Sequence, residues 1–451
     1  MLLLLKIADD NILQQLSTSF RMKSKHIFIL LLAVWNQVKG QADSSSLATQ
    51  LHAYFKTLTT LKQFNGNVLV AIDDNILLNQ TYNMDTAIDS LKVNHNSKFI
   101  IASVSKIFIK YALLKLVELN KLELTDSVSK YIPDFPNGSK ITIEHLVKHQ
   151  SGLPRELSGN HEIDTLSLAK IIAIAKTEKL QFEPGTQTLY SNVGYFLLHY
   201  IIEKTASDGY AAFMHDAIFK PMGLNNTTEL HALPANMPFV YGFDNVDGTI
   251  TATSKANLYQ TETGNYLSTI SDLHAFSKSI LNEKNLPNNL ALKIFGSDSL
   301  LVQAGGRPGY RAYFYLNPKT KTTFIFACNY SDIPMQKITT DVINMLAGKP
   351  YEMPVNINRK AIDVPLRLLQ KYAGNYVLEA DISKIITIKF IGNKLYNVDD
   401  TEQTELFADS ANTFFENPNS NDGYVFKYNP QTQKYDLTIV FNGMPLKTKR
   451  Q

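Results

Sequence analysis

A serine and a lysine three positions apart occur twice in the chain within the same four letters, SVSK, at residues 103–106 and 127–130. A serine hydroxyl is a weak nucleophile until a neighbouring base takes its proton. A lysine held in an apolar setting can be that base, because burial disfavours its charged form. Ser167 and Lys170 make a third match, so the spacing alone selects no site.

The residues around the first copy favour Ser103 as a nucleophile and Lys106 as its base. The apolar stretch 99–102 ends at Ser103, and apolar residues then recur at the spacing of a helix as far as Val117. We therefore predict that Ser103 begins a long, mostly buried helix, with Lys106 one turn along the same face. The free N–H groups and positive dipole end of a helix start suit an oxyanion.

The other two copies lie in less suitable surroundings. Pro133 follows Lys130 by three residues and stops a helix there, so we expect Ser127 and Lys130 in a solvated loop. Ser167 and Lys170 are expected on the surface, in the first turn of another amphipathic helix.

A second motif, Tyr190-Ser191-Asn192, precedes an apolar-periodic segment that ends near residue 204. The phenol of Tyr190 could transfer protons at the serine, and the amide of Asn192 could hold a substrate amide or the lysine. The alternative interpretation is that Asn192 only caps the helix and Tyr190 only packs. A second Tyr-x-Asn, Tyr315 with Asn317, is expected to be structural, at a strand end.

The composition is that of a globular protein and excludes several classes of function. The 451 residues are 44% hydrophobic and 19% charged. A net charge of +3 is no electrostatic footprint for nucleic acid. The single cysteine, Cys328, lies in an apolar run and is expected to be a buried hydrophobic residue. No Cys/His cluster with metal-ligand spacing is present, so we expect no metal and no cofactor.

The order of elements predicts an α+β fold with two domains. A hairpin at 67–80, mostly helical residues from 104 to about 290, two strands in 310–330 and a helix at 334–348 indicate an antiparallel sheet with a helical insertion. We place this domain at 43–347 and a proline-containing linker at 348–360. Short alternating segments in 361–451 predict a small all-β barrel or sandwich.

The N-terminus resembles a targeting segment. From Met22 the chain has two lysines, an apolar run at 27–34 and small residues at 38–40. The run is too short to span a bilayer. We expect residues 1–42 to be an extension plus signal peptide, with a mature protein exported to the periplasm or secreted from about Gln41. The alternative is an apolar N-terminal helix of a cytoplasmic protein.

With both motifs in place, the chain resembles the serine β-lactamase-related family, which includes class-C-type β-lactamases, penicillin-binding-protein-like D-Ala peptidases and esterases. The similar stretches are 99–154, 182–204, 218–228 and 264–281, within roughly residues 50–345. The resemblance implies a β-lactamase/transpeptidase-like fold. It also implies that Ser103 is the nucleophile, Lys106 its base, Tyr190 the proton donor to the leaving group, and Asn192 a residue that orients the substrate.

The family's third motif, Lys-Thr-Gly or His-x-Gly, is altered here to Gln303-Ala304-Gly305. Gln303 can donate hydrogen bonds, but it carries no charge and shuttles no protons. Gly305 and Gly306 fit the family pattern, and the Gly306 N–H is expected to be a second oxyanion donor beside that of Ser103. Arg307 brings a positive charge nearby, in a direction that the sequence does not give.

These observations predict an exported serine hydrolase that cleaves an ester or amide of a small molecule or peptide through an acyl-enzyme. One alternative is a catalytically weak homologue that binds cell-wall peptide or a partner protein. Another is a true β-lactamase or D-Ala peptidase. We expect no nucleic acid partner and no stable membrane span, while the substrate and the oligomeric state stay open. His149, before the sequence SGLP, is expected to be a hydrogen-bonded structural histidine.

Overall fold

The computed structural model describes residues 46–159, 166–230, 239–246, 248–253, 265–282, 300–379, 381–399, 403–418, 420, 422–441 and 444–451. The chain divides into two compact units, residues 1–53 and 54–451, and a helix covers residues 46–60. The predicted signal segment lies outside the described residues. Within those residues, no helix is both long enough and apolar enough to cross a membrane.

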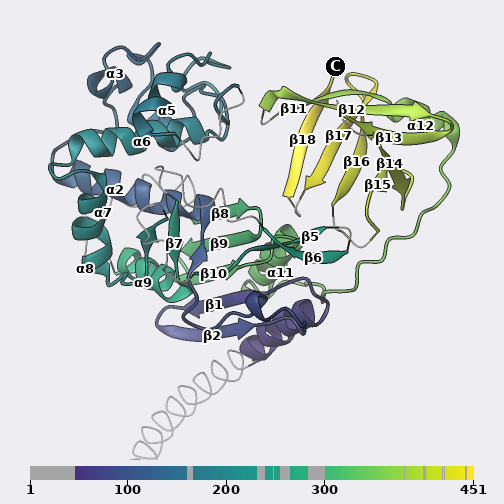
Figure 1. The fold of residues 1–451 in the computed structure, drawn as a ribbon, viewed down its shortest axis with the longest axis horizontal. Helices are drawn as coiled ribbons and strands as arrows, with labels where there is room; N and C mark the ends of the chain where they lie inside the picture. The colour runs from purple at the N-terminus through teal and green to yellow at the C-terminus, as the bar shows by residue number, and fades with distance from the viewer. Residues whose placement is uncertain are drawn as a thin grey trace, which may run out of the picture. The chain divides into compact units, whose positions relative to one another are not determined.

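A five-stranded antiparallel sheet with the order β2-β1-β10-β9-β8 is the frame of the first part of the larger unit (Figure 1). The central strands are buried along almost their whole length, whereas the edge strand β8 alternates between buried and more exposed residues and the edge strand β2 is mostly exposed or half-buried. This pattern follows from a sheet that is covered on both faces. The strands are β1 (Gly66–Ile72), β2 (Asn75–Tyr82), β8 (Leu301–Arg307), β9 (Tyr310–Asn317) and β10 (Thr322–Cys328).

Among the helices between β2 and β8, α2 (Lys106–Glu118) packs on α6 (Asn192–Thr205), and α6 also contacts α4, α5 and α7. Phe108 of α2 contacts three aromatic rings edge-to-face, those of Phe219, Tyr266 and Phe276. The other described helices between these strands are α3 (Val128–Tyr131), α4 (Ile143–Val147), α5 (Leu168–Ala175), α7 (Tyr210–Met214), α8 (Lys220–Met222) and α9 (Ile270–Leu281), and α11 (Met335–Leu346) follows β10. Helix α9 packs against β1 and β10.

Short strands and turns complete this region. The order β3-β7-β4 forms a small sheet, and β5 pairs with β6. Strand β3 leads into the 3-10 turn η2 (Ala102–Ser105), which α2 follows directly. These strands are β3 (Phe99–Ile100), β4 (Thr228–Glu229), β5 (Phe243–Val246), β6 (Thr249–Ala252) and β7 (Tyr266–Ser268), with further short helical turns η1 (Asp89–Leu91) and η4 (His215–Phe219).

The C-terminal segment forms a closed eight-stranded barrel, so the predicted small all-β domain is confirmed as a barrel. Its interior is aromatic: Tyr372 of α12 (Leu366–Tyr372) stacks on Phe426 at 4.2 Å and meets Phe414 edge-to-face. The strands are β11 (Gly374–Leu378), β12 (Asp381–Ile391), β13 (Lys394–Val398), β14 (Gln403–Ala408), β15 (Thr413–Phe415), β16 (Gly423–Asn429), β17 (Lys434–Phe441) and β18 (Met444–Arg450). The α+β fold class is therefore confirmed, and the domain limits stay predictions.

Two local expectations have different outcomes. Cys328 is fully buried, and burial raises the pKa of its thiol to about 12, as expected of a small core residue. The expectation of a loop at the second SVSK is wrong, because Val128–Tyr131 form the short helix α3. This helix is tied to the next segment by a hydrogen bond from the Val128 amide to the Ile141 carbonyl at 2.8 Å. Pro133 limits its length and does not prevent its start.

Candidate active site

Ser103 lies in the turn η2, between β3 and α2. The predicted α-helix begins three residues later than expected, at Lys106, and the serine occupies a 3-10 turn. Ala102 has φ +46°, in the left-handed region that residues with a Cβ rarely adopt. Such a conformation costs of order 1 kcal/mol and persists only where the surroundings fix it. The turn therefore fixes the direction of the Ser103 side chain.

Gly305 of strand β8 lies directly behind this turn. A Cβ added at Gly305 would stand 2.3 Å from the Ile101 carbonyl oxygen and 3.1 Å from the Ser103 amide nitrogen. No side chain fits at that distance, and only glycine lets the two backbones approach so closely. The glycine of the altered third motif is thus required by packing against the serine turn.

Two proton-carrying side chains converge on the Ser103 hydroxyl. The Lys106 Nζ lies 3.0 Å from Ser103 Oγ, and the Tyr190 hydroxyl donates to the same oxygen at 2.9 Å. The Lys106 side chain is buried, with its Nζ 5.2 Å from the centres of the Tyr190 and Tyr195 rings. The serine therefore has one basic and one phenolic group within hydrogen-bonding distance, as nucleophilic catalysis needs.

Asn192 is the first residue of α6, and its amide faces the lysine. Its Oδ1 accepts a hydrogen bond from Lys106 Nζ at 2.9 Å, and its Nδ2 donates to Glu156 Oε1 at 2.6 Å. The interpretation that Asn192 caps the helix is wrong, because the capping side chain is that of Ser191, whose Oγ accepts from the Gly194 amide at 3.0 Å. The sequence analysis did not identify Glu156 as a site residue. The only signal in the sequence is its position two residues after SGLP.

His149 supports the tyrosine of the site. Its ring stacks on Tyr190 with centroids 4.5 Å apart, and its Nδ1 accepts from the Ser191 amide at 3.1 Å. Burial lowers the pKa of His149 to about 3, and the charges of Lys110 and Lys106 add to this shift. As expected, His149 is a hydrogen-bonded structural histidine, and it is neutral at physiological pH.

Lys110, one turn after Lys106 on α2, is a second lysine in this region that the sequence analysis did not single out. Burial and the charge of Lys106 lower its pKa to about 8. The sequence pattern of this helix does not show that Lys110 is buried near a second charge, because that depends on how the helix packs in the folded protein.

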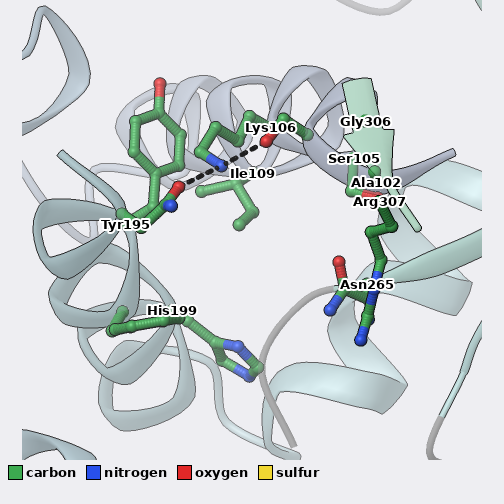
Figure 2. Close-up of a pocket in the computed structure, with 12 residues that line it drawn as sticks. Ala102, Ser105, Lys106, Ile109, Tyr195, His199, Asn265, Gly306 and Arg307 are labelled. Atoms are coloured by element: carbon green, nitrogen blue, oxygen red, sulfur yellow. Dashed lines mark hydrogen bonds between the residues drawn. The ribbon is translucent and has the colours of Figure 1, made fainter. Parts of the chain in front are cut away.

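The third-motif residues separate into two groups. Gly306 and Arg307 line a cavity of about 170 Å³ together with Ser103. Figure 2 shows Lys106 and Gly306 at its upper edge, with Arg307 and Asn265 on one side and His199 on the other. Gln303 is buried, and its Nε2 donates to the adjacent Ala304 carbonyl at 3.2 Å. The amide that replaces the family's cation is therefore engaged with its own strand.

The site brings together a serine hydroxyl, a buried lysine and a phenol, with Ser103 and Lys106 lining the cavity, and these are residue types that nucleophilic catalysis uses. The model of the family described as Beta-lactamase matches residues 53–344. The chain therefore belongs to the Beta-lactamase family, and the resemblance seen in the sequence is confirmed.

Known relatives agree with this assignment. The chain is 28% identical to Penicillin-binding protein 4* of Bacillus subtilis (strain 168), over 81% of this chain and 90% of that protein. It is 24% identical to Protein flp of Staphylococcus aureus (strain MW2), over 72% of this chain and 70% of that protein. The octameric penicillin-binding protein homologue from Pyrococcus abyssi has the same fold, with a TM-score of 0.59 at 19% identity, over 89% of this chain and 99% of that one.

Proposed function

We propose that the protein is a serine hydrolase that cleaves an ester or amide through an acyl-enzyme on Ser103. The observation that carries this proposal is the convergence of Lys106 Nζ and the Tyr190 hydroxyl on one oxygen, at 3.0 and 2.9 Å. Family membership supports the same reaction class.

In the proposed acylation, Ser103 Oγ attacks the substrate carbonyl carbon while Lys106, as the neutral amine, takes the serine proton. The amide N–H groups of Ser103 and Gly306 stabilise the charge that develops on the carbonyl oxygen. Tyr190 gives its proton to the departing oxygen or nitrogen as the bond to carbon breaks, and the proton held by Lys106 restores the phenol. Water then hydrolyses the ester on Ser103 and regenerates the hydroxyl.

Asn192 and Glu156 position the lysine in this scheme. The amide oxygen of Asn192 accepts from Lys106, and Glu156 fixes the amide by accepting from its nitrogen. This chain of hydrogen bonds orients the base toward Ser103, and the amide can also contact an incoming substrate amide.

A second candidate function is stable acylation without efficient turnover, which is penicillin binding. It is supported by the 28% identity to Penicillin-binding protein 4* of Bacillus subtilis and by the neutral Gln303 at the third motif. In this case the serine still becomes acylated, and the difference lies in the rate at which water releases the acyl group.

The proposed export rests on the sequence of residues 22–40 alone. N-terminal sequencing of the protein recovered from cells should begin near Gln41. A first residue at Met1 or Met22 would contradict export through this segment.

The function is tested with p-nitrophenyl acetate and p-nitrophenyl butyrate on the chain from Gln41. We expect a burst of p-nitrophenol and the mass of one acyl group on the protein, both absent in Ser103→Ala and both retained in Ser127→Ala. A burst without steady turnover would favour the second candidate. Folded protein that shows no burst and no adduct would contradict both candidates and leave a binding protein on a hydrolase fold.

A further inference from the structure

Strand β8 presents a neutral residue at one end of the site and a cation at the other. Side chains two residues apart share a face of a strand, so Gln303, Gly305 and Arg307 share one face. Four residues of strand span about 13 Å, so Gln303 and Arg307 lie at opposite ends, with Gly305 at the serine turn between them. The strand thus carries a neutral amide at Gln303, where the family pattern has a cation or an imidazole, and a positive charge at Arg307.

The cavity at the Arg307 end lies on the acyl side of the nucleophile. Ser103, Lys106 and Asn192 are among the residues that line it, and Tyr190 is not among the described lining residues. A leaving group must depart beside the residue that protonates it, here Tyr190. The part of the substrate that stays bonded to Ser103 therefore occupies the cavity.

The walls of this cavity have an apolar middle and a polar end. Ile109 and Phe196 supply apolar surface, while Arg307 and Asn265 lie together on one side (Figure 2). A volume of about 170 Å³ equals roughly six water molecules at 30 Å³ each, which suits a short acyl chain. Arg307 makes contacts within the protein, and it brings a guanidinium, with its fork of N–H donors and its permanent charge, to the lining of this cavity.

We propose that this cavity selects a short acyl group that ends in a carboxylate, of the size of a succinyl or glutaryl group, and that Arg307 binds the carboxylate with help from the Asn265 amide. The inference rests on the proposed function, since it names the acyl part of the substrate that Ser103 would attack. Guanidinium and carboxylate match in shape and charge and form two parallel hydrogen bonds. The bond broken is the ester or amide at the other end of the acyl chain, and water supplies the oxygen and proton of the products.

The test compares mono-p-nitrophenyl glutarate with p-nitrophenyl valerate, which has the same chain length and no carboxylate. We expect kcat/KM to be about 10- to 100-fold higher for the glutarate ester, the ratio that a charge-assisted hydrogen bond supplies. In Arg307→Gln the ratio of the two kcat/KM values should fall to about one. Arg307→Lys should keep part of the preference. Lys319→Gln, which removes an exposed cation at the β9–β10 turn, should keep all of it.

Equal rates for the two esters, or a preference that survives Arg307→Gln, would overturn the proposal. A second measurement separates its failure from that of the hydrolase function. Monomethyl glutarate and methyl valerate are titrated calorimetrically into Ser103→Ala and into Ser103→Ala/Arg307→Gln. Binding of the glutarate alone, lost with Arg307, would support the carboxylate site even if neither nitrophenyl ester is turned over. No binding to Ser103→Ala together with equal ester rates would reject the site and leave the hydrolase intact.

Discussion

The two SVSK segments of this chain have the same letters and different chemistry. In the first, the Lys106 side chain is buried and its Nζ lies 3.0 Å from the Ser103 hydroxyl. In the second, the Lys130 side chain is 54% exposed and pairs with Asp126 at 2.7 Å. The serine turn of the first copy begins with a left-handed residue, Ala102, whereas Ser127 of the second has an ordinary extended backbone.

The difference teaches that burial and neighbours, rather than spacing, make a serine and a lysine reactive. The partner of Lys130 is the Asp126 carboxylate, and its side chain is exposed to solvent. Beside Lys106 the partners are the Asn192 amide, two aromatic rings and the serine itself. The following predictions test this contrast in matched pairs.

The largest effect is expected from removing the hydroxyl. Ser103→Ala should lower kcat/KM for p-nitrophenyl butyrate by at least about 10³-fold, because it removes the oxygen on which the acyl-enzyme is proposed to form. Ser127→Ala should leave it within about twofold. The kcat/KM of both variants is measured by steady-state kinetics. A comparable loss in Ser127→Ala would contradict the assignment of Ser103 as the nucleophile.

Removal of the amine should have the next largest effect. Lys106→Met, which keeps the length of the buried side chain, should reduce kcat by about 10²- to 10⁴-fold through loss of the base. Lys130→Met should change kcat less than twofold and cost at most about 1 kcal/mol in stability, as an exposed ion pair does. The two rates are measured by burst kinetics, with circular dichroism to confirm folding. A Lys106→Met enzyme as fast as the wild type would exclude Lys106 as the base.

Each copy also has a glycine packed against its backbone, which gives a third pair. A Cβ at Gly305 would stand 3.1 Å from the Ser103 amide nitrogen, and one at Gly138 would stand 3.1 Å from the Ser129 amide nitrogen. Both alanine variants should lose about 1–3 kcal/mol of stability through overpacking. Only Gly305→Ala should also lower kcat, by about 10-fold or more, because it shifts the serine turn. Urea denaturation measures the loss of stability in both variants, and ester hydrolysis measures kcat. An equal fall in kcat for Gly138→Ala would contradict the prediction.

The smallest effect concerns the second lysine near the active copy. The folded-state pKa of Lys110 is about 8, below its ordinary value of 10.5, so the folded protein binds fewer protons than the unfolded chain between these values. The free energy of unfolding should therefore rise with pH from about 8 to about 10.5. Lys110→Met should stabilise the protein by about 1–2 kcal/mol at pH 7, and this gain should vanish by about pH 10.5. Urea denaturation at pH 7 and pH 10 checks this, and a gain independent of pH would rule out the buried charge as its cause.

The sequence predicted those parts of the molecule that depend on local patterns. Alternation and turn residues indicated the hairpin β1–β2, the pair β9–β10 and an all-β C-terminal segment, and apolar periodicity indicated α2 and α6. The order of motifs placed Ser103, Lys106, Tyr190 and Asn192 together, as the structure has them. Each of these inferences needs only neighbouring residues or a matched pattern.

The parts that could not be predicted depend on tertiary contacts. Glu156 reaches Asn192 across 36 residues of sequence, and no spacing rule connects a loop glutamate with a helix start. The direction of Arg307 depends on the register of β8 beside the serine turn. Helix α3 forms because its first turn is tied to residues 141–142, which local reasoning about Pro133 does not include.

The central claim is that the first copy, and only the first, becomes acylated. Trypsin separates the two copies, since cleavage after Lys98 and Lys106 releases residues 99–106, and cleavage after Lys121 and Lys130 releases residues 122–130. The protein is quenched in acid during the burst with p-nitrophenyl butyrate, digested and analysed by tandem mass spectrometry. We predict a butyryl group on residues 99–106, assigned to Ser103 rather than Ser105 by its fragment ions. A butyryl group on residues 122–130, or on Ser105, would contradict the account.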